Sequence, residues 1–377
     1  MKSNYRYIVK AFMAMAVIAG TTSCDDFLDR EPMSSISPET YYSTAAQLEA
    51  NLNDEYPNVL PSFGQWTYGI FGEDKGTDNQ IEVNANDRYT QDRWKVPHSE
   101  SDNWKFERIY RINFFLSEAL PKFGEDMSGS QNTISGSVAT IKHYIGEMYF
   151  LRAYEYFKKL QLFGDFPIID QPLADEMEAL REASKRFPRN EVARFIISDL
   201  DKAYAYMSDV DMATTRINKD AAMLVKSRVA LFEATWLQNF KGTAFVPGGE
   251  GWPGASLHNN YQYPSGNLDN EVKYFLEQAV EASKLVADKY KGNLTENTGV
   301  LQQSADDPSN PYFDMFAQED LSDVKEVLLW RQYARGLSTH NINAAAGRGN
   351  YRIGLTRGFV QNFLMKDGTP VYAHGSY

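Results

Sequence analysis

The sequence has little cysteine and little histidine. Cys24 is the only cysteine among 377 residues, and there are five histidines. A single thiol cannot form a disulfide within the chain, so the hydrophobic core must hold the fold together. The histidines are scattered without metal-ligand spacing, and no glycine-rich loop between a strand and a helix offers a phosphate site. We therefore expect no bound metal and no cofactor.

Basic residues are fewer than acidic ones, 38 against 50, which gives a net charge of −12. An acidic surface argues against nucleic acid and anionic lipid head groups as ligands, and it is compatible with a neutral ligand such as a sugar. Aromatic residues are abundant, with 23 Tyr, 22 Phe and 6 Trp. Some must lie in the core, but this number also suits a surface that stacks on flat ligands.

Residues 1–23 follow the plan of a secretory signal peptide. Lys2, Arg6 and Lys10 precede an apolar run over residues 11–20, and small residues follow it. This run is too short to span a bilayer. We expect the segment to be removed from the mature protein, which would make the net charge three units more negative.

The small residues after the apolar run lead directly into Cys24, as in a lipobox. The cysteine of a lipobox is lipidated and becomes the mature N-terminus. The alternative is an ordinary secreted protein with an incidental cysteine, but a lone thiol outside the cell tends to react. We expect Cys24 to carry the lipid anchor and residues 24–36 to form a tether.

Apolar residues recur at spacings of three and four in most of the remaining chain, which predicts amphipathic helices. Ser37, Ser137, Asn190 and Asn218 are the expected N-caps. The expected helices cover about residues 37–55, 102–120, 137–164, 190–207, 218–236 and 270–290. Strand signals are sparse, with residues 326–330 the best and 351–355 second. The pattern predicts a mainly α fold of tetratricopeptide-like stacked helical hairpins, with long irregular ligand-binding loops and little strand.

Two stretches between the expected helices, residues 57–100 and 237–269, are rich in glycine, proline, asparagine and aromatic residues. Long loops of this kind usually have a function. The candidate ligand contacts are Trp66, Trp94 and Trp252 for stacking on sugar rings, and Asp78 and Asn79 for hydrogen bonds to hydroxyls. The alternative is that the tryptophans hold the loops on the helices. Trp104 and Trp236 lie in helical stripes and are expected in the core.

Several segments in order resemble the SusD/RagB family. They are Cys24-Asp-Asp-Phe-Leu-Asp, Trp104-x5-Tyr110-x2-Asn113, Gly146-Glu147-x3-Leu151-Arg152-Ala153-Tyr154, Leu162-Phe-Gly-Asp-Phe-Pro167, Pro188-Arg189-Asn190, Asp199-Leu200-Asp201, Asn218-Lys219, Arg228-Val-Ala-Leu231, Glu326-Val327 and Lys366-Asp367-Gly368. The resemblance implies an α-helical, surface-exposed outer-membrane lipoprotein for nutrient uptake in polysaccharide utilisation. It would bind glycans or oligosaccharides and deliver them to a SusC-like TonB-dependent transporter, without catalysis. The acidic pair after Cys24 resembles the surface-export signal of these lipoproteins.

The resemblance assigns residues 37–377 to a SusD-like α-helical domain. Family members usually continue well beyond the Asp-Gly motif, whereas this chain ends nine residues after Gly368. We therefore expect the domain to lack the family's usual C-terminal part.

Three other functions remain open. A surface-exposed glycoside hydrolase would need two facing carboxylates, and the sequence singles out no such pair. A peptide-binding lipoprotein of the same uptake system would use the same scaffold, and a helical-repeat adaptor would bind no small ligand. Glu147 and Arg152, both in the longest expected helix, suggest a functional charge pair, but a structural tie between helices is the expected role.

Overall fold

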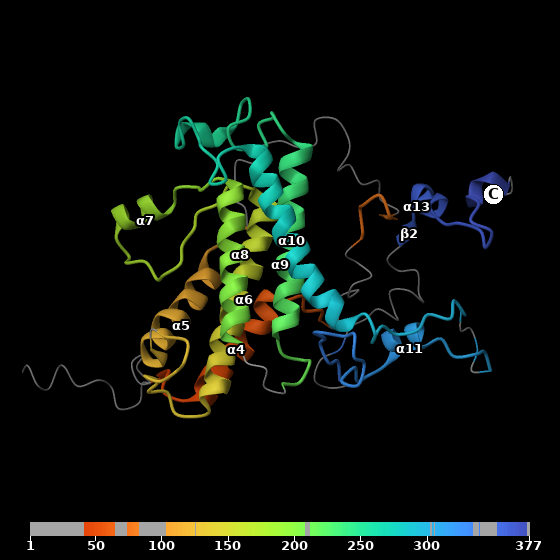
Figure 1. Cartoon of the computed structure of the whole chain (residues 1–377), viewed down its shortest axis with the longest axis horizontal. Helices are drawn as coiled ribbons and strands as arrows, with labels where there is room; N and C mark the ends of the chain where they lie inside the picture. Colours follow the sequence, from red (N-terminus) through yellow and green to blue (C-terminus); the bar gives the residue numbers. More distant parts are fainter. Residues whose placement is uncertain are drawn as a thin grey trace, which may run out of the picture.

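The computed structural model describes residues 41–64, 74–82, 103–124, 126–207, 212–301, 304, 306–334, 339 and 353–374. Within these ranges the fold is mainly α, as predicted, with two short strands. The expected signal peptide, tether and lipidation site, residues 1–36, lie outside the described residues. Figure 1 shows a bundle of long helices, with smaller elements from the C-terminal third of the chain beside it.

Six helices form the bundle. They are α4 (Ala45–Val59), α5 (Glu107–Phe123), α6 (Val138–Phe163), α8 (Arg189–Tyr206), α9 (Lys219–Asn239) and α10 (Leu268–Tyr290). Shorter helical elements lie in the connections and near the C-terminus: α7 (Met177–Ala183), η3 (Pro253–Ser256), α11 (Pro311–Ala317), α13 (Arg357–Gln361) and η4 (Val371–His374).

The helices stack in chain order. Both α4 and α5 pack on α6, and then α6 packs on α8, α8 on α9 and α9 on α10. Their apolar stripes meet in one continuous core, whose fully buried members include Leu52, Phe115, Ile145, Phe150, Tyr156, Ile196, Leu200, Val229 and Phe275. Stacking of neighbouring helices is the arrangement that the periodic pattern predicted.

Helix ends set by local capping follow the sequence closely. The Ser137 side chain accepts a hydrogen bond from the Thr140 N–H at 3.4 Å, and the Asn218 side chain accepts one from Ala221 at 3.0 Å. Gly164 ends α6 with φ of 67°, a conformation that favours glycine. Two predicted N-caps of the long helices were confirmed in this way.

Of the other two expected helix starts, Ser37 is not tested, and the start at Asn190 was wrong. Helix α4 begins at Ala45, because Thr44 and Gln47 form a capping box there, and Ser37 lies outside the described residues. Helix α8 begins two residues earlier than expected, at Arg189, with Pro188 in the N-cap position instead of Asn190. Asn190 does not cap it, because its side chain is buried and donates to Glu271 instead.

The best predicted strand, residues 326–330, is not a strand. Its backbone is held by isolated bonds to the segment before α9: Leu328 O accepts from the Asn218 amide at 2.6 Å, and Trp330 N–H donates to Thr214 O at 3.1 Å. The second predicted strand is confirmed in part. Strand β2 (Ile353–Leu355) pairs antiparallel with β1 (Gln80–Glu82), with Gln80 opposite Leu355.

Candidate functional site

Buried arginine–carboxylate pairs fix the helices relative to one another. In each pair the guanidinium donates two or more hydrogen bonds to both oxygens of one carboxylate, the strong bidentate geometry. The pairs are Arg152–Asp199 between α6 and α8, Arg189–Glu233 between α8 and α9, Arg194–Glu271 between α8 and α10, and Arg216–Glu147 between the segment before α9 and α6. Helix α8 takes part in three of them, so its outer face has a well-defined position.

Glu147 and Arg152 of the family-like motif do not pair with each other. Arg152 Nε lies 2.6 Å from Asp199, and Arg152 Nη1 donates to the Asn113 side chain and the Asp170 carbonyl, each at 2.9 Å. Arg152 thus connects its own helix, α6, to α8, to α5 and to a loop carbonyl. The structural role predicted for this motif is confirmed.

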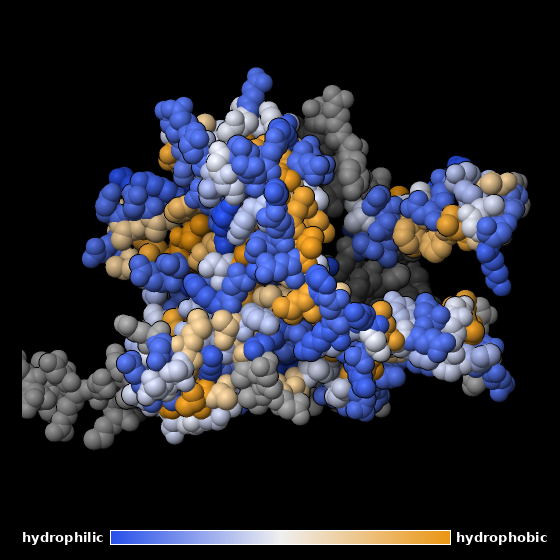
Figure 2. Space-filling model, in the orientation of Figure 1, coloured by the Kyte–Doolittle hydropathy of each residue, from blue (hydrophilic) through white to orange (hydrophobic). Residues whose placement is uncertain are grey.

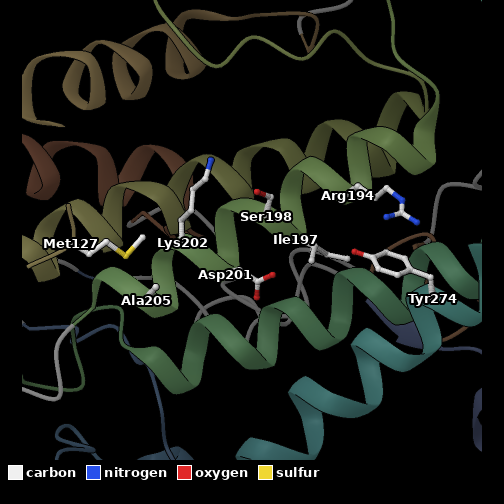
Figure 3. Close-up of a pocket in the computed structure, with 8 residues that line it drawn as sticks. All are labelled: Met127, Arg194, Ile197, Ser198, Asp201, Lys202, Ala205 and Tyr274. Atoms are coloured by element: carbon white, nitrogen blue, oxygen red, sulfur yellow. The ribbon is translucent and has the colours of Figure 1, made fainter. Parts of the chain in front are cut away.

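The outer face of α8 forms one wall of a groove of about 360 Å³. Residues three and four apart on α8 line it, together with Tyr274 of α10 and Met127 of the turn before α6 (Figure 3). Its lining residues are Met127, Arg194, Ile197, Ser198, Asp201, Lys202, Ala205 and Tyr274. The volume lies in the usual range of small-ligand sites.

Arg194 and Tyr274 form one end of the groove, where contacts within the protein hold both side chains in place. Arg194 donates to Glu271 at 2.7 and 2.8 Å and to Ser265 Oγ at 2.7 Å. Its guanidinium carbon lies 3.7 Å from the centroid of the Tyr274 ring. Burial raises the pKa of Tyr274, so its hydroxyl stays neutral and can both donate and accept.

Two of the charged residues that line the groove, Arg194 and Asp201, are paired within the protein. Burial alone would raise the pKa of Glu271, but hydrogen bonds from Arg194, Asn190 and Ser265 outweigh it and hold the pKa below its usual value. Glu271 therefore stays ionised opposite Arg194. Asp201 accepts from Lys226 Nζ at 2.7 Å. Lys202 Nζ lies 3.7 Å from Asp199, whose carboxylate already accepts from Arg152, so Lys202 adds a positive charge to the groove.

A second, more apolar hollow of about 230 Å³ lies where α5 begins, beside the segment before α7. Phe106, Tyr110, Leu173 and Leu180 supply most of its apolar wall, and Gln171 is among its polar groups. Tyr110 is half-exposed. Because few polar groups line this hollow, it suits an apolar ligand better than a ligand rich in hydroxyl groups.

The position of Trp252 contradicts its predicted role in sugar stacking. Its side chain is only 5% exposed, and the indole N–H donates to Asp165 Oδ2 at 2.7 Å. The His258 ring stacks beside it with centroids 6.0 Å apart. Asp165 also accepts from the Arg189 N–H at 2.9 Å, so Trp252 anchors its loop on the start of α8.

The other predicted contacts lie elsewhere. Asp78 is exposed and Asn79 half-buried, just before β1, and both carbonyls accept hydrogen bonds from Thr356. In Figure 1 this segment lies beside the bundle, away from the loop of Trp252, so the structure does not bring the two together. Trp66 and Trp94 lie outside the described residues. Trp104 and Trp236 pack against the core, as predicted.

The groove residues were not singled out in the sequence. Arg194, Ser198, Asp201 and Lys202 follow helical spacing, which is also the pattern of any solvated helix face. Tyr274, from a helix that begins more than sixty residues after the end of α8, and Met127, from the turn before α6, make this face a groove. The groove can therefore be recognised only from contacts between segments that are distant in the sequence.

The described residues contain neither a metal-binding cluster nor a helix suited to span a membrane. Within the ranges that the structure describes, no three histidine, cysteine, aspartate or glutamate side chains gather as metal ligands. None of the described helices combines the length and apolar character needed to cross a bilayer.

A stacked helical array with a polar groove on its outer face defines a class of helical scaffold proteins. Comparison with known families makes the assignment specific. A SusD-like family model, described as "Starch-binding associating with outer membrane", matches residues 26–231, more than half of the chain. The protein therefore belongs to the SusD-like family.

Curated relatives agree with this assignment. SusD-like protein P2 of Formosa agariphila is 25% identical over 253 residues, which cover 64% of this chain and 46% of that protein. SusD-like protein P25 of the same organism is 25% identical over 233 residues, 57% of this chain and 41% of that protein. The chain thus spans less than half the length of the curated relatives it matches.

A solved structure shows a similar fold. A SusD-like carbohydrate-binding protein from Bacteroides fragilis matches 88% of this chain and 55% of its own, with a TM-score of 0.52 and 15% identity. At that identity the likeness supports the helical architecture and no further property.

Proposed function

We propose that the protein is a surface-exposed outer-membrane lipoprotein that binds glycans or oligosaccharides and delivers them to a SusC-like TonB-dependent transporter. The observation that carries the proposal is the family match, which starts at residue 26, two residues after Cys24. Cys24 would carry the lipid, and the protein would act by capture, without catalysis.

The groove on α8 is the proposed glycan-binding subsite. A sugar presents hydroxyls on its edges and an apolar face on its ring. Tyr274 offers an aromatic surface, and Ser198 and Asp201 offer hydrogen-bonding groups beside it (Figure 3). Arg194 and Asp201 are paired within the protein, so Lys202 is the main charge left for a ligand, and a saccharide that uses mostly hydroxyl hydrogen bonds suits the groove.

Trp66, Trp94, Asp78 and Asn79 remain proposed ligand contacts on the strength of the sequence. The exposed Asp78 side chain is free to meet a ligand at the edge of β1. Trp252 is not proposed again, because its indole is buried.

A hydrolase has less support. Glycoside hydrolysis needs two carboxyl groups flanking the scissile bond. Among the residues that line the described groove, Asp201 is the single carboxylate. A peptide cargo of the same uptake system is the other outcome that the experiment must distinguish.

The expected result of Tyr274→Ala is a roughly fivefold weaker affinity for the bound glycan, about 1 kcal/mol, through lost ring contact. Residues 25–377 would be screened by affinity gel electrophoresis against neutral and acidic polysaccharides, with release of reducing ends assayed in parallel. Lys273→Ala is the matched control, since Lys273 is the preceding residue, is 74% exposed and does not line the groove.

Three other outcomes of the screen would count against parts of the proposal. Release of reducing ends would favour a hydrolase. Retardation by peptides alone would favour a peptide cargo. Equal affinities of the Tyr274→Ala and Lys273→Ala variants for a bound glycan would move the subsite away from the α8 groove.

A second prediction concerns the anchor. Cys24→Ala is expected to leave the protein outside the membrane fraction or with its signal uncleaved, because the variant has no thiol to lipidate. Fractionation after metabolic labelling with a fatty-acid analogue would test this. A labelled, membrane-bound variant would refute lipidation at Cys24.

A further inference from the structure

Lys202 is the cation of the α8 groove whose charge is least compensated. Its side chain is 43% exposed, and its Nζ lies 3.7 Å from Asp199 Oδ1, which is too long for a hydrogen bond. Both oxygens of Asp199 already accept from Arg152, at 2.6 and 2.8 Å. The Nζ also lies 5.3 Å from the centroid of the Tyr149 ring, a contact that does not neutralise it. Two cations thus share one carboxylate, which leaves a net positive charge at this place.

The other charged side chains that line the groove are each matched by an opposite charge. Arg194 donates to both oxygens of Glu271, at 2.7 and 2.8 Å. Asp201 accepts from Lys226 Nζ at 2.7 Å. Because these two pairs add no net charge, Lys202 supplies the charge that a ligand in the groove meets.

One further carboxylate lies close to the Met127 end of the groove. Asp126 precedes Met127 in the chain and is exposed. Its two oxygens accept from the hydroxyls of Ser128 and Ser130, at 2.8 and 3.1 Å. Within the part of the chain that the structure describes, Asp126 forms no ion pair with Lys202. The Asp126 carboxylate is therefore bonded within its own turn and does not neutralise Lys202 by direct contact.

Lys202 and Tyr274 lie at opposite ends of the groove. Figure 3 shows Lys202 and Met127 at one end, and Arg194 with Tyr274 at the other. Arg194 and Lys202 are eight residues apart on α8, which at about 1.5 Å per residue is about 12 Å along the helix. That length exceeds a single sugar ring. A saccharide that packs on Tyr274 and also reaches Lys202 must therefore contain at least two sugar units.

We propose that the α8 groove selects an acidic oligosaccharide, in which a carboxylate or a sulfate ester meets Lys202 while another sugar unit packs on Tyr274. The inference rests on the proposed glycan binding and adds the chemical class of the glycan. A lysine ammonium presents three donors on a flexible stem, so it can bind either kind of oxyanion. A hydrogen bond between ionised groups is about twice as strong as one between neutral groups. Lys202 is thus the groove residue that separates an acidic sugar from a neutral one.

The acidic balance of the whole protein limits the charge of the ligand without preventing this contact. The net charge of −12 is spread over 377 residues. At physiological ionic strength the Debye length is about 8 Å, so exposed charges farther than this from the groove are largely screened. A densely charged polymer would extend beyond the groove and meet the acidic surface around it. An acidic group on an otherwise neutral oligosaccharide therefore suits the site best.

Titration calorimetry of residues 25–377 at about 0.15 M salt would test the inference with matched oligosaccharides. The carboxylate pair is glucuronosyl xylotriose and its carboxyl-reduced form. The sulfate pair is neocarratetraose disulfate and its desulfated form. In at least one pair, the acidic form is expected to bind about five- to tenfold more tightly than its neutral form. Lys202→Met is expected to bring that ratio close to one, because methionine keeps an apolar stem and removes the charge.

Lys273→Met is the matched control. Lys273 is 74% exposed and does not line the groove, and its replacement changes the net charge by the same amount. This variant is expected to keep the preference for the acidic form. Circular dichroism would verify that both variants are folded.

The outcomes separate this inference from the proposed glycan binding. Equal affinities for the acidic and neutral forms, both weakened by Tyr274→Ala, would overturn the inference and leave glycan binding in the groove standing. A ratio that falls equally in Lys202→Met and Lys273→Met would also overturn it, because the preference would then follow the overall charge. Binding of none of these oligosaccharides, nor of any polysaccharide in the affinity-gel screen, would overturn both. A Lys202-dependent preference in one pair alone would support the inference and identify the acidic group.

Discussion

Replacing Arg152 with methionine is expected to lower the free energy of unfolding by about 3–5 kcal/mol. Asp199, which is 0% exposed, would then be a buried carboxylate without its bidentate partner. Asn113 and the Asp170 carbonyl would each lose a donor at the same time. Methionine preserves much of the side-chain volume, so the effect would come mainly from lost hydrogen bonds and uncompensated charge.

Chemical denaturation monitored by circular dichroism would measure the loss. Arg181→Met is the matched control, because Arg181 and Glu178 form an ion pair in which both side chains are largely exposed. That change is expected to leave stability almost unchanged. The double variant Arg152→Met with Asp199→Leu is expected to recover much of the loss, because it removes the stranded charge. Equal stability of Arg152→Met and the wild type would refute a structural role for this pair.

Gly146→Ala is expected to destabilise the fold by about 3 kcal/mol, the upper end of the range for overpacking. A Cβ at this position would lie 2.8 Å from Met207 N and Cγ and 2.9 Å from Ala203 O. Two of these atoms belong to the backbone, so a rotamer change cannot relieve the contact. Helices α6 and α8 would have to move apart.

The same denaturation assay distinguishes this contact from a general effect of glycine in a helix. Gly358 lies in α13, and an added Cβ there would meet no atom within 4 Å. Gly358→Ala is therefore expected to leave stability unchanged or raise it slightly, since alanine restricts the unfolded chain. A destabilisation by Gly146→Ala no larger than that of Gly358→Ala would mean that the α6–α8 contact is looser than described.

Features governed by nearby residues were predictable from the sequence. Ser137 and Asn218 cap helices through bonds to residues three positions away, and the apolar stripes identified the helices themselves. The expected strand at residues 326–330 failed because its apolar residues do not meet a partner strand. Instead, Leu328 and Trp330 meet the segment before α9, more than a hundred residues earlier.

The candidate site was less predictable, because it depends on contacts between distant segments. Trp252 looked like an exposed loop aromatic, yet Asp165, almost ninety residues earlier, draws its indole into the interior. Tyr274 was not singled out in the sequence, yet its ring lies against Arg194 at the end of a groove. Composition does not distinguish an aromatic residue that is buried, such as Trp252, from one that lines a groove, such as Tyr274.

The chain-order stacking of the helices has a consequence for how the protein reaches its native state. From α5 to α10, each long helix packs on the long helix that precedes it in the sequence. Contacts that are close in sequence have a small loop-closure cost and favour rapid folding. A polypeptide that emerges N-terminus first can thus add each helix to a layer already formed, without waiting for a distant segment.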